Sequence, residues 1–298
     1  MRLPCGRMSP TLTLVLLLGL LPVQAASPGL EIRVAGGWQP WPAYGPGAVA
    51  APAPVLGVAV TWRDSAPGLR IGAFDVRTAD GLLRNSVAIL EIDPARWRFA
   101  LAAAPVFERR SAEDWLRTDT TLALAVNTGL FRESGLPIGL VVMDGVQRGA
   151  PVGWLDAVVA LENGAPRLLP LDAALAPGAS AFQTLPWLVR DGRVALGVTS
   201  GVRLSRTHRD RRITLCLGTD ARVRLLLSNF EVFGATVGRV PVGLTIPEQA
   251  ALAAGAGCRD AVALDGGISA QIAARSGGRL VRMPGWRKVP LMMVLRPR

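Results

Sequence analysis

The sequence predicts an α+β fold, a single strand-rich domain with a mixed sheet and a few flanking helices. Short β-branched or alternating apolar runs, separated by turn-forming residues, recur along most of the chain. Two segments, residues 111–114 and 245–248, have the form of a capping box that starts a helix. No internal repeat of about 20 to 50 residues is present, so no repeat architecture is expected.

The first 25 residues have the pattern of a secretory signal peptide. Arg2 and Arg7 form a basic start, residues 11–23 are apolar, and residues 23–25 (VQA) have the form of a signal-peptidase site. The apolar run is shorter than the roughly 20 residues that a membrane span needs. We therefore expect cleavage near Ala25, a periplasmic or secreted protein, and no membrane span in the mature chain.

Two further regions follow the signal peptide. Residues 26–56 are rich in Pro, Gly and Ala, which predicts a poorly ordered leader or a loosely docked strap that makes contacts through Trp38 and Trp41. The compact domain is predicted to span residues 57–298. A composition of 50% hydrophobic and 18% charged residues favours a packed globule over a disordered chain.

Most predicted elements of the domain are strands. Residues 121–126 form a continuous apolar run, which is typical of a strand buried on both faces. The middle of the chain, from about residue 140 to 200, alternates strand-like runs with Gly, Pro and Asp turns. The other predicted elements are strands at 57–62, 69–77, 86–93 and 97–103, a helix from 111, a hairpin of 213–218 and 223–228, a helix from 245, and a strand at 261–265.

The chain is strongly basic, with 33 Lys and Arg against 22 Asp and Glu and a formal net charge of +11. Lys288 is the only lysine, so arginines supply almost all of this charge. Two explanations stay open: a general compositional bias toward arginine, or an anionic substrate or envelope surface that guanidinium groups would suit. Because no DNA-binding motif and no basic stripe with interleaved aromatics occurs, a nucleic-acid partner is not expected.

Cys216 and Cys258 are the cysteines that remain after the predicted cleavage. An oxidising compartment permits a disulfide between them, but each also lies beside an apolar run, where a free cysteine packs as a small hydrophobic residue. His208 is the only histidine and no CxxC motif is present, so a zinc site is not expected. A Ser-His-Asp triad is also excluded unless His208 is its base.

Three polar side chains stand at the ends of predicted strands. Asn127 follows the run 121–126, Arg212 begins the run 213–218, and Asp265 follows the apolar residues 261–264. Each alone is typical of a turn or an exposed flank, which is also how we interpret Arg211. Together they supply the carboxamide, guanidinium and carboxylate that a polar pocket over a sheet edge needs.

These motifs, in this order, resemble the phosphodiester glycosidase family over residues 57–298. The matching pieces are N-x-G-x-F at 127–131, Q-x-x-P at 183–186, Arg212, and GC-x-x-A followed by LDGGISAQ at 257–271. The family includes a lysosomal enzyme that removes N-acetylglucosamine from a sugar phosphodiester, and exported bacterial relatives. The resemblance therefore implies a hydrolase that cleaves the glycosidic bond of a sugar-1-phosphodiester or a related envelope glycan.

The resemblance also implies which residues line the cleft. Two departures from the family pattern, Thr128 and Leu185, replace smaller residues and are expected to narrow the cleft. We expect no cofactor and no metal, although the sequence is compatible with a weakly bound divalent cation near Asp265. The expected catalytic residues are Asp265, Arg212 and Asn127, and the expected substrate-binding residues are Gly266, Gly267, Ser269, Gln183 and Gly129.

In the mechanism that we expect, Arg212 neutralises the leaving phosphate and Asp265 acts as general base or stabilises an oxocarbenium-like transition state. Backbone amides of the two glycines after Asp265 would orient substrate oxygens. Glycosidases commonly use two carboxylates, and the sequence does not single out the second. The candidates are Glu133, Asp144 and Glu231, whereas Glu91 and Asp93 are expected to be structural.

The alternative is a non-catalytic envelope protein that binds, or helps to assemble, an anionic polysaccharide. Such a protein would need Arg212 and Asn127 but would make no use of Asp265. An aspartate beside an anionic ligand is repelled by it, so its place in the predicted pocket favours the enzyme.

Overall fold

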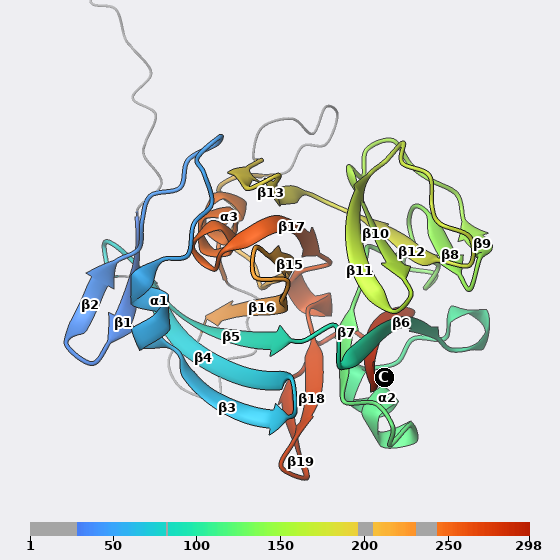
Figure 1. Ribbon diagram of the computed structural model, residues 1–298. Helices are drawn as coiled ribbons and strands as arrows, with labels where there is room; N and C mark the ends of the chain where they lie inside the picture. Colours follow the sequence, from blue (N-terminus) through green and yellow to red (C-terminus); the bar gives the residue numbers. More distant parts are fainter. Residues whose placement is uncertain (1–28, 82, 196–204, 231–242) are drawn as a thin grey trace, which may run out of the picture.

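The computed structural model describes residues 29–81, 83–195, 205–230 and 243–298. The predicted signal peptide and Glu231 lie outside these ranges. Strands dominate the described part, and three α-helices accompany them (Figure 1). The predicted strand-rich class is confirmed. The predicted mixed sheet is not, because every pairing between the described strands is antiparallel.

The largest sheet has ten strands in the order β14-β13-β17-β15-β16-β5-β4-β1-β2, with β3 paired to β4. It is buried on both faces, because Leu225 and Leu227 enter one hydrophobic core and Leu226 enters the opposite one. The strands are β1 Leu30–Val34, β2 Gly37–Pro40, β3 Thr61–Ala66, β4 Leu69–Thr78, β5 Arg84–Ile92, β13 Trp187–Arg190, β14 Arg193–Val194, β15 Arg212–Gly218, β16 Val223–Phe230 and β17 Cys258–Leu264.

Two five-stranded sheets share one hydrophobic core with the large sheet. The apolar run at 121–126 leads into β7, the central strand of one of them, and all four residues of β7 are buried. The first sheet runs β11-β10-β12-β8-β9 and the second β19-β18-β7-β20-β6. Their strands are β6 Trp97–Ala103, β7 Leu124–Asn127, β8 Val141–Met143, β9 Val146–Gly149, β10 Ala157–Glu162, β11 Ala165–Pro170, β12 Ser180–Thr184, β18 Ile272–Ser276, β19 Arg279–Met283 and β20 Leu291–Pro297.

Both predicted capping boxes are confirmed. Ser111 caps α2 (Ala112–Thr118) together with Asp114, and Thr245 caps α3 (Ile246–Gly255) together with Glu248. Helix α3 supplies apolar side chains to the second core of the large sheet, on the face opposite the small sheets. Short 3₁₀ turns occur at Pro105–Phe107 and Gly267–Ser269.

The segment 26–56 differs from the predicted leader, because from residue 29 onward it is part of the fold. Strand β1 pairs with β4, and Trp41 is only 5% exposed. The Trp41 ring stacks on Phe74 with ring centroids 6.5 Å apart, and its Nε1–H donates to the Ala251 carbonyl. Residues 57–59, predicted as strand, instead complete the helix α1 (Pro54–Ala59), whose first residue is a proline that favours helix initiation.

A disulfide joins Cys216 of β15 to Cys258 of β17, with the Cα atoms 5.4 Å apart. This resolves the two alternatives that the sequence left open. The bridge lies near the end of the strand pair where Gly218 faces Cys258, and Ile213 faces Leu264 at the other end. It therefore fixes these two strands to each other at the end opposite the predicted site.

The packing of Trp41 predicts that replacing it will destabilise the whole fold. We expect Trp41→Ala to lower the free energy of unfolding by about 3–5 kcal/mol, because it empties a buried aromatic site. The matched control is Trp38→Ala on β2, whose partly exposed ring contacts Arg77 and should contribute below about 1 kcal/mol. Urea denaturation measures both variants. Similar small losses would contradict the docking of this segment.

Candidate active site

Asp265 follows directly after β17, and the end of β7 holds its backbone in place. Its N–H donates to the Thr128 carbonyl at 2.8 Å, and its carbonyl accepts from Asn127 Nδ2 at 2.7 Å. Asn127 is 1% exposed, and its Oδ1 accepts from the Gln271 N–H at 2.8 Å. The structure thus brings Asn127 and Asp265 together as predicted. It gives the Asn127 amide the task of positioning the Asp265 turn, in place of the predicted catalytic contact.

Gln183 and Gly129, predicted to bind substrate, lie side by side in a buried wall. The Gln183 Oε1 accepts two backbone N–H groups and its Nε2 donates to two carbonyls, all within residues 140–155. A Cβ on Gly129 would lie 2.3 Å from the Gln183 carbonyl oxygen, so this glycine permits a close backbone approach. The Gln183 amide has no bonding capacity left for a ligand.

The two residues expected to narrow the cleft are buried instead. Thr128 is 1% exposed and donates its hydroxyl to the Leu291 carbonyl. Leu185 is 7% exposed and precedes Pro186 through a cis peptide bond. Both side chains therefore pack inside the protein.

Gly266 and Gly267 make room for another part of the chain and not for the predicted ligand. The Gly267 N–H donates to the Arg211 carbonyl at 3.0 Å, and a Cβ on Gly266 would lie 2.6 Å from that oxygen. Gly267 has φ of +61°, and a Cβ there would lie 3.0 Å from Asp210 Oδ2. The Gly266 N–H bonds to the carboxylate of Asp265. The glycines thus admit Asp210 to the Asp265 turn.

Asp210 is the second carboxylate that the sequence did not identify. Burial raises the pKa of Asp265 to about 7, and the nearby charge of Asp210 raises it further. The Ser269 hydroxyl, which bonds to Asp265 as its predicted place in the site requires, acts in the opposite direction, as does the charge of Arg287. Burial also raises the pKa of Asp210, against the charge of Arg212. The two carboxyl groups therefore form an electrostatically coupled pair.

The other second-carboxylate candidates do not join this pair. Glu133 is exposed on the loop after β7. Asp144 lies in the turn between β8 and β9, where its backbone N–H bonds to Ser180. A signal for Asp210 existed in the strand register: Ile213 faces Leu264, so the residues just before β15 and just after β17 leave the sheet at the same edge.

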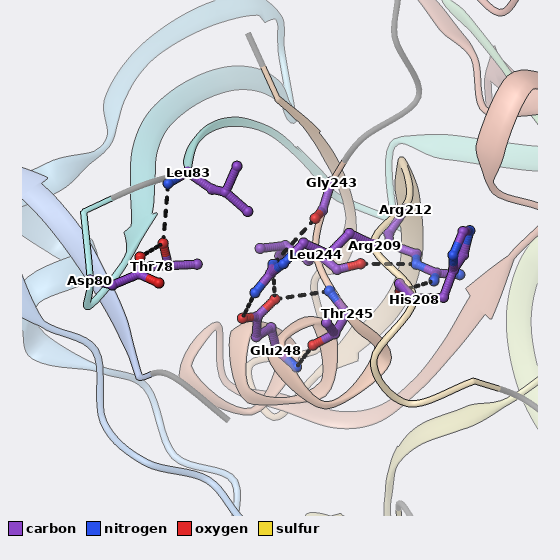
Figure 2. A network of polar contacts seen from close by, with 10 residues as sticks. All are labelled: Thr78, Asp80, Leu83, His208, Arg209, Arg212, Gly243, Leu244, Thr245 and Glu248. Carbon is purple, nitrogen blue, oxygen red and sulfur yellow. Dashed lines mark hydrogen bonds and ion pairs between the residues drawn. The ribbon is translucent and has the colours of Figure 1, made fainter. Parts of the chain in front are cut away.

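Arg212 lies beside Asp210 and braces the turn before β15. Its Nε donates to the Leu244 carbonyl at 3.1 Å and its Nη2 to the His208 carbonyl at 3.0 Å (Figure 2). Burial lowers the pKa of Arg212, and Asp210 opposes that shift. His208 is exposed, with Nε2 3.8 Å from Asp210 Oδ2. Figure 2 also shows Arg209 paired with Glu248 at the start of α3.

Arg211 is 3% exposed, which contradicts its interpretation as an exposed flank. Its Nη1 donates to the Pro284 carbonyl at 2.8 Å, so it fastens the loop between β19 and β20 to the site. That loop carries Arg287, whose guanidinium lies 5.1 Å from the centre of the Phe131 ring and whose charge lowers the pKa of Asp265. Arg287 is thus a second site residue that the sequence analysis missed, and no local motif marks it.

The assembled site contains two coupled carboxyl groups flanked by two guanidinium groups. This arrangement can exchange a proton with a substrate or water and also hold an anion. Within the described residues, no group of three or more His, Cys, Asp or Glu side chains is arranged to hold a metal ion. The expected lack of a cofactor remains a prediction.

The close contact of Gly267 with Asp210 gives a testable consequence. We expect Gly267→Ala to lower the free energy of unfolding by about 2–3 kcal/mol, from backbone strain plus the clash with Asp210. Gly278→Ala is the control, since Gly278 has φ of +74° and open space around it, and should cost about 1 kcal/mol. Equal losses in urea denaturation would show that Asp210 does not approach Gly267.

Comparison with known structures identifies three similar folds. The zebrafish N-acetylglucosamine-1-phosphodiester α-N-acetylglucosaminidase catalytic domain, auto-inhibited by its pro-peptide, has a TM-score of 0.61 and 18% identity, covering 83% of this chain and 91% of its own. A hypothetical protein from Synechocystis has a TM-score of 0.60 and 15% identity over 80% of this chain, which spans 64% of that protein. A candidate exported protein from Burkholderia pseudomallei K96243 has a TM-score of 0.54 and 16% identity, covering 74% and 76%.

At these identities the structural likeness establishes the fold alone. No curated protein sequence matches this chain. The sequence model of one family, described as phosphodiester glycosidase, matches residues 120–296, which include both carboxylates and both arginines of the site. On the extent of this match, the chain belongs to the phosphodiester glycosidase family.

Proposed function

We propose that this protein is an exported hydrolase that cleaves the glycosidic C–O bond of a sugar-1-phosphodiester. The observation that carries the proposal is the coupled pair of Asp265 and Asp210 beside Arg212 and Arg287. A pKa of about 7 keeps a substantial fraction of Asp265 ionised near neutral pH, where a general base works best. Membership of the phosphodiester glycosidase family supports the same reaction class.

In the proposed reaction, water attacks the anomeric carbon while the bond from that carbon to the phosphate oxygen breaks. Ionised Asp265 accepts the proton of the water, and Asp210 sustains the raised basicity of Asp265 through its negative charge. The electron pair of the broken bond leaves with the phosphate monoester. Because a phosphate monoester is stable as an anion near neutral pH, charge neutralisation by arginine replaces much of the work of a general acid.

Arg212 and Arg287 are the candidates for neutralising the phosphate. In Arg212, Nε and Nη2 bond to backbone carbonyls, and Nη1 makes no hydrogen bond within the described residues. Arg287 lies on the opposite side of the Asp265 turn, on the loop after β19. We assign the phosphate to the space between these two side chains.

Two features support export. The Cys216–Cys258 disulfide is of a kind that persists in oxidising compartments. The first 25 residues have the pattern of a signal peptide, and the described helices are all too short or too polar to cross a membrane. We therefore place the mature protein in the periplasm or outside the cell.

Sugar release by the purified protein tests the reaction. We expect turnover of at least one member of a panel of methyl sugar-1-phosphodiesters, and a loss of about 100-fold or more in kcat for Asp265→Asn. Asp172→Asn, on an exposed loop, is the charge-matched control and should retain full activity. Binding without turnover would favour the non-catalytic glycan-binding alternative. Full activity of Asp265→Asn would remove Asp265 from its role.

The pH profile tests the carboxylate pair. Since the ionised form of Asp265 is needed, kcat/KM should fall as the pH drops through about 7. Asp210→Asn removes a like charge, lowers the pKa of Asp265 and should move this midpoint to lower pH. Glu133→Gln, an exposed carboxylate outside the pair, should leave the midpoint unchanged. An unshifted midpoint in Asp210→Asn would break the proposed coupling.

Stability provides a second measurement of the same group. The folded-state pKa of Asp265, about 7, is above the ordinary value of 3.8, so between these values the folded protein binds more protons than the unfolded chain. The contribution of Asp265 to the free energy of unfolding therefore decreases as pH rises from about 4 to 7. Asp265→Asn should lack this dependence.

A further inference from the structure

The loop between β19 and β20 holds one tryptophan in a fixed but exposed position. The Trp286 and Arg287 N–H groups both donate to the Ile268 carbonyl, at 2.8 and 3.0 Å. Buried Gln271 donates to the Arg287 carbonyl at 2.8 Å, and buried Arg211 donates to the Pro284 carbonyl. The backbone on both sides of Trp286 is therefore anchored, while its side chain is 56% exposed.

This exposure is unusual among the tryptophans of the chain. Of the eight, six have ring or indole contacts within the described protein, and Trp154 and Trp286 have none. Trp154 is the less exposed of these two, at 38%. The partnered rings are Trp38, Trp41, Trp62, Trp97, Trp115 and Trp187.

Trp286 also adjoins the carboxylate pair. Its backbone partner Ile268 lies between Gly267 and Ser269, in the same turn as Asp265, and is itself 42% exposed. The residue after Trp286 is Arg287, whose charge acts on Asp265. Two exposed apolar side chains thus lie next to the charged groups that we assign to the reaction.

A sugar ring fits this combination of surfaces. A pyranose carries hydroxyl groups around its edge and C–H groups on its faces, and the electron-rich face of an aromatic ring attracts such C–H groups. Exposed apolar area that is fixed in position and surrounded by polar groups is typical of a binding site. A phosphate alone would use the guanidinium groups and would have no use for an indole.

Building on the proposed function, we propose that Trp286, with Ile268 beside it, forms the apolar wall of a subsite that packs against the pyranose ring of the substrate. The anchored loop holds the indole in place before the substrate arrives, which reduces the entropy lost on binding. Trp286 is then a specificity-determining residue, because it favours substrates whose ring exposes a C–H face.

Binding to an inactive protein tests this subsite without relying on turnover. The probe is the methyl diester of N-acetylglucosamine 1-phosphate, titrated by calorimetry into Asp265→Asn, with the equivalent diesters of glucose and galactose as further probes. We expect Trp286→Ala in this background to raise Kd about tenfold and Trp286→Phe to stay within about threefold. Trp38→Ala, on a strand six positions from β17 in the sheet, should leave Kd unchanged.

The outcomes separate the two proposals. An unchanged Kd in Trp286→Ala overturns the subsite, whether or not the wild type is an enzyme. Weakened binding in Trp286→Ala, together with no turnover by the wild type, supports the subsite and overturns the hydrolase. If no diester binds to Asp265→Asn and none is cleaved by the wild type, both are overturned. The Trp286 side chain is exposed, so unchanged urea midpoints are expected for its variants.

Discussion

The site depends on a junction of three sheets at the end of β17. Thr184 of β12 donates to the Ala263 carbonyl, Asn127 of β7 donates to the Asp265 carbonyl, and Thr128 accepts the Asp265 N–H. β17 itself belongs to the large sheet. Buried polar groups need such partners, since an unpaired one costs about 1–3 kcal/mol. The bonds that satisfy these buried groups also fix the backbone that carries the reactive carboxyl group.

The same junction explains why carboxyl groups with raised pKa values persist there. Burial of Asp265 and Asp210 disfavours their charged forms, which costs stability at neutral pH. The surrounding backbone is too well fixed to relax and expose them. Arg212 and Arg287 reduce the repulsion without pairing fully with either acid, so basicity is retained along with a net attraction for anions.

Elements with a strong local pattern were predictable from sequence. The capping boxes of α2 and α3, the buried strand β7 and the β15–β16 hairpin are all present. The first two strands were not predicted, because Pro and Gly on either side obscure the alternating Leu30 and Ile32 that bury them. In the site, Asp265 and Ser269 follow from one local motif. Asp210 and Arg287 depend on how distant strands and loops come together, which no local pattern records.

The disulfide between Cys216 and Cys258 has a consequence for the integrity of the chain. It encloses the sequence between β15 and β17, including β16 and α3, in a covalent loop with a separation of 42 residues. A protease outside the cell that cut once within this loop would therefore leave both fragments attached to each other. Since Asp210 precedes the loop and Asp265 follows it, a nicked molecule would keep both acids on one covalently joined unit.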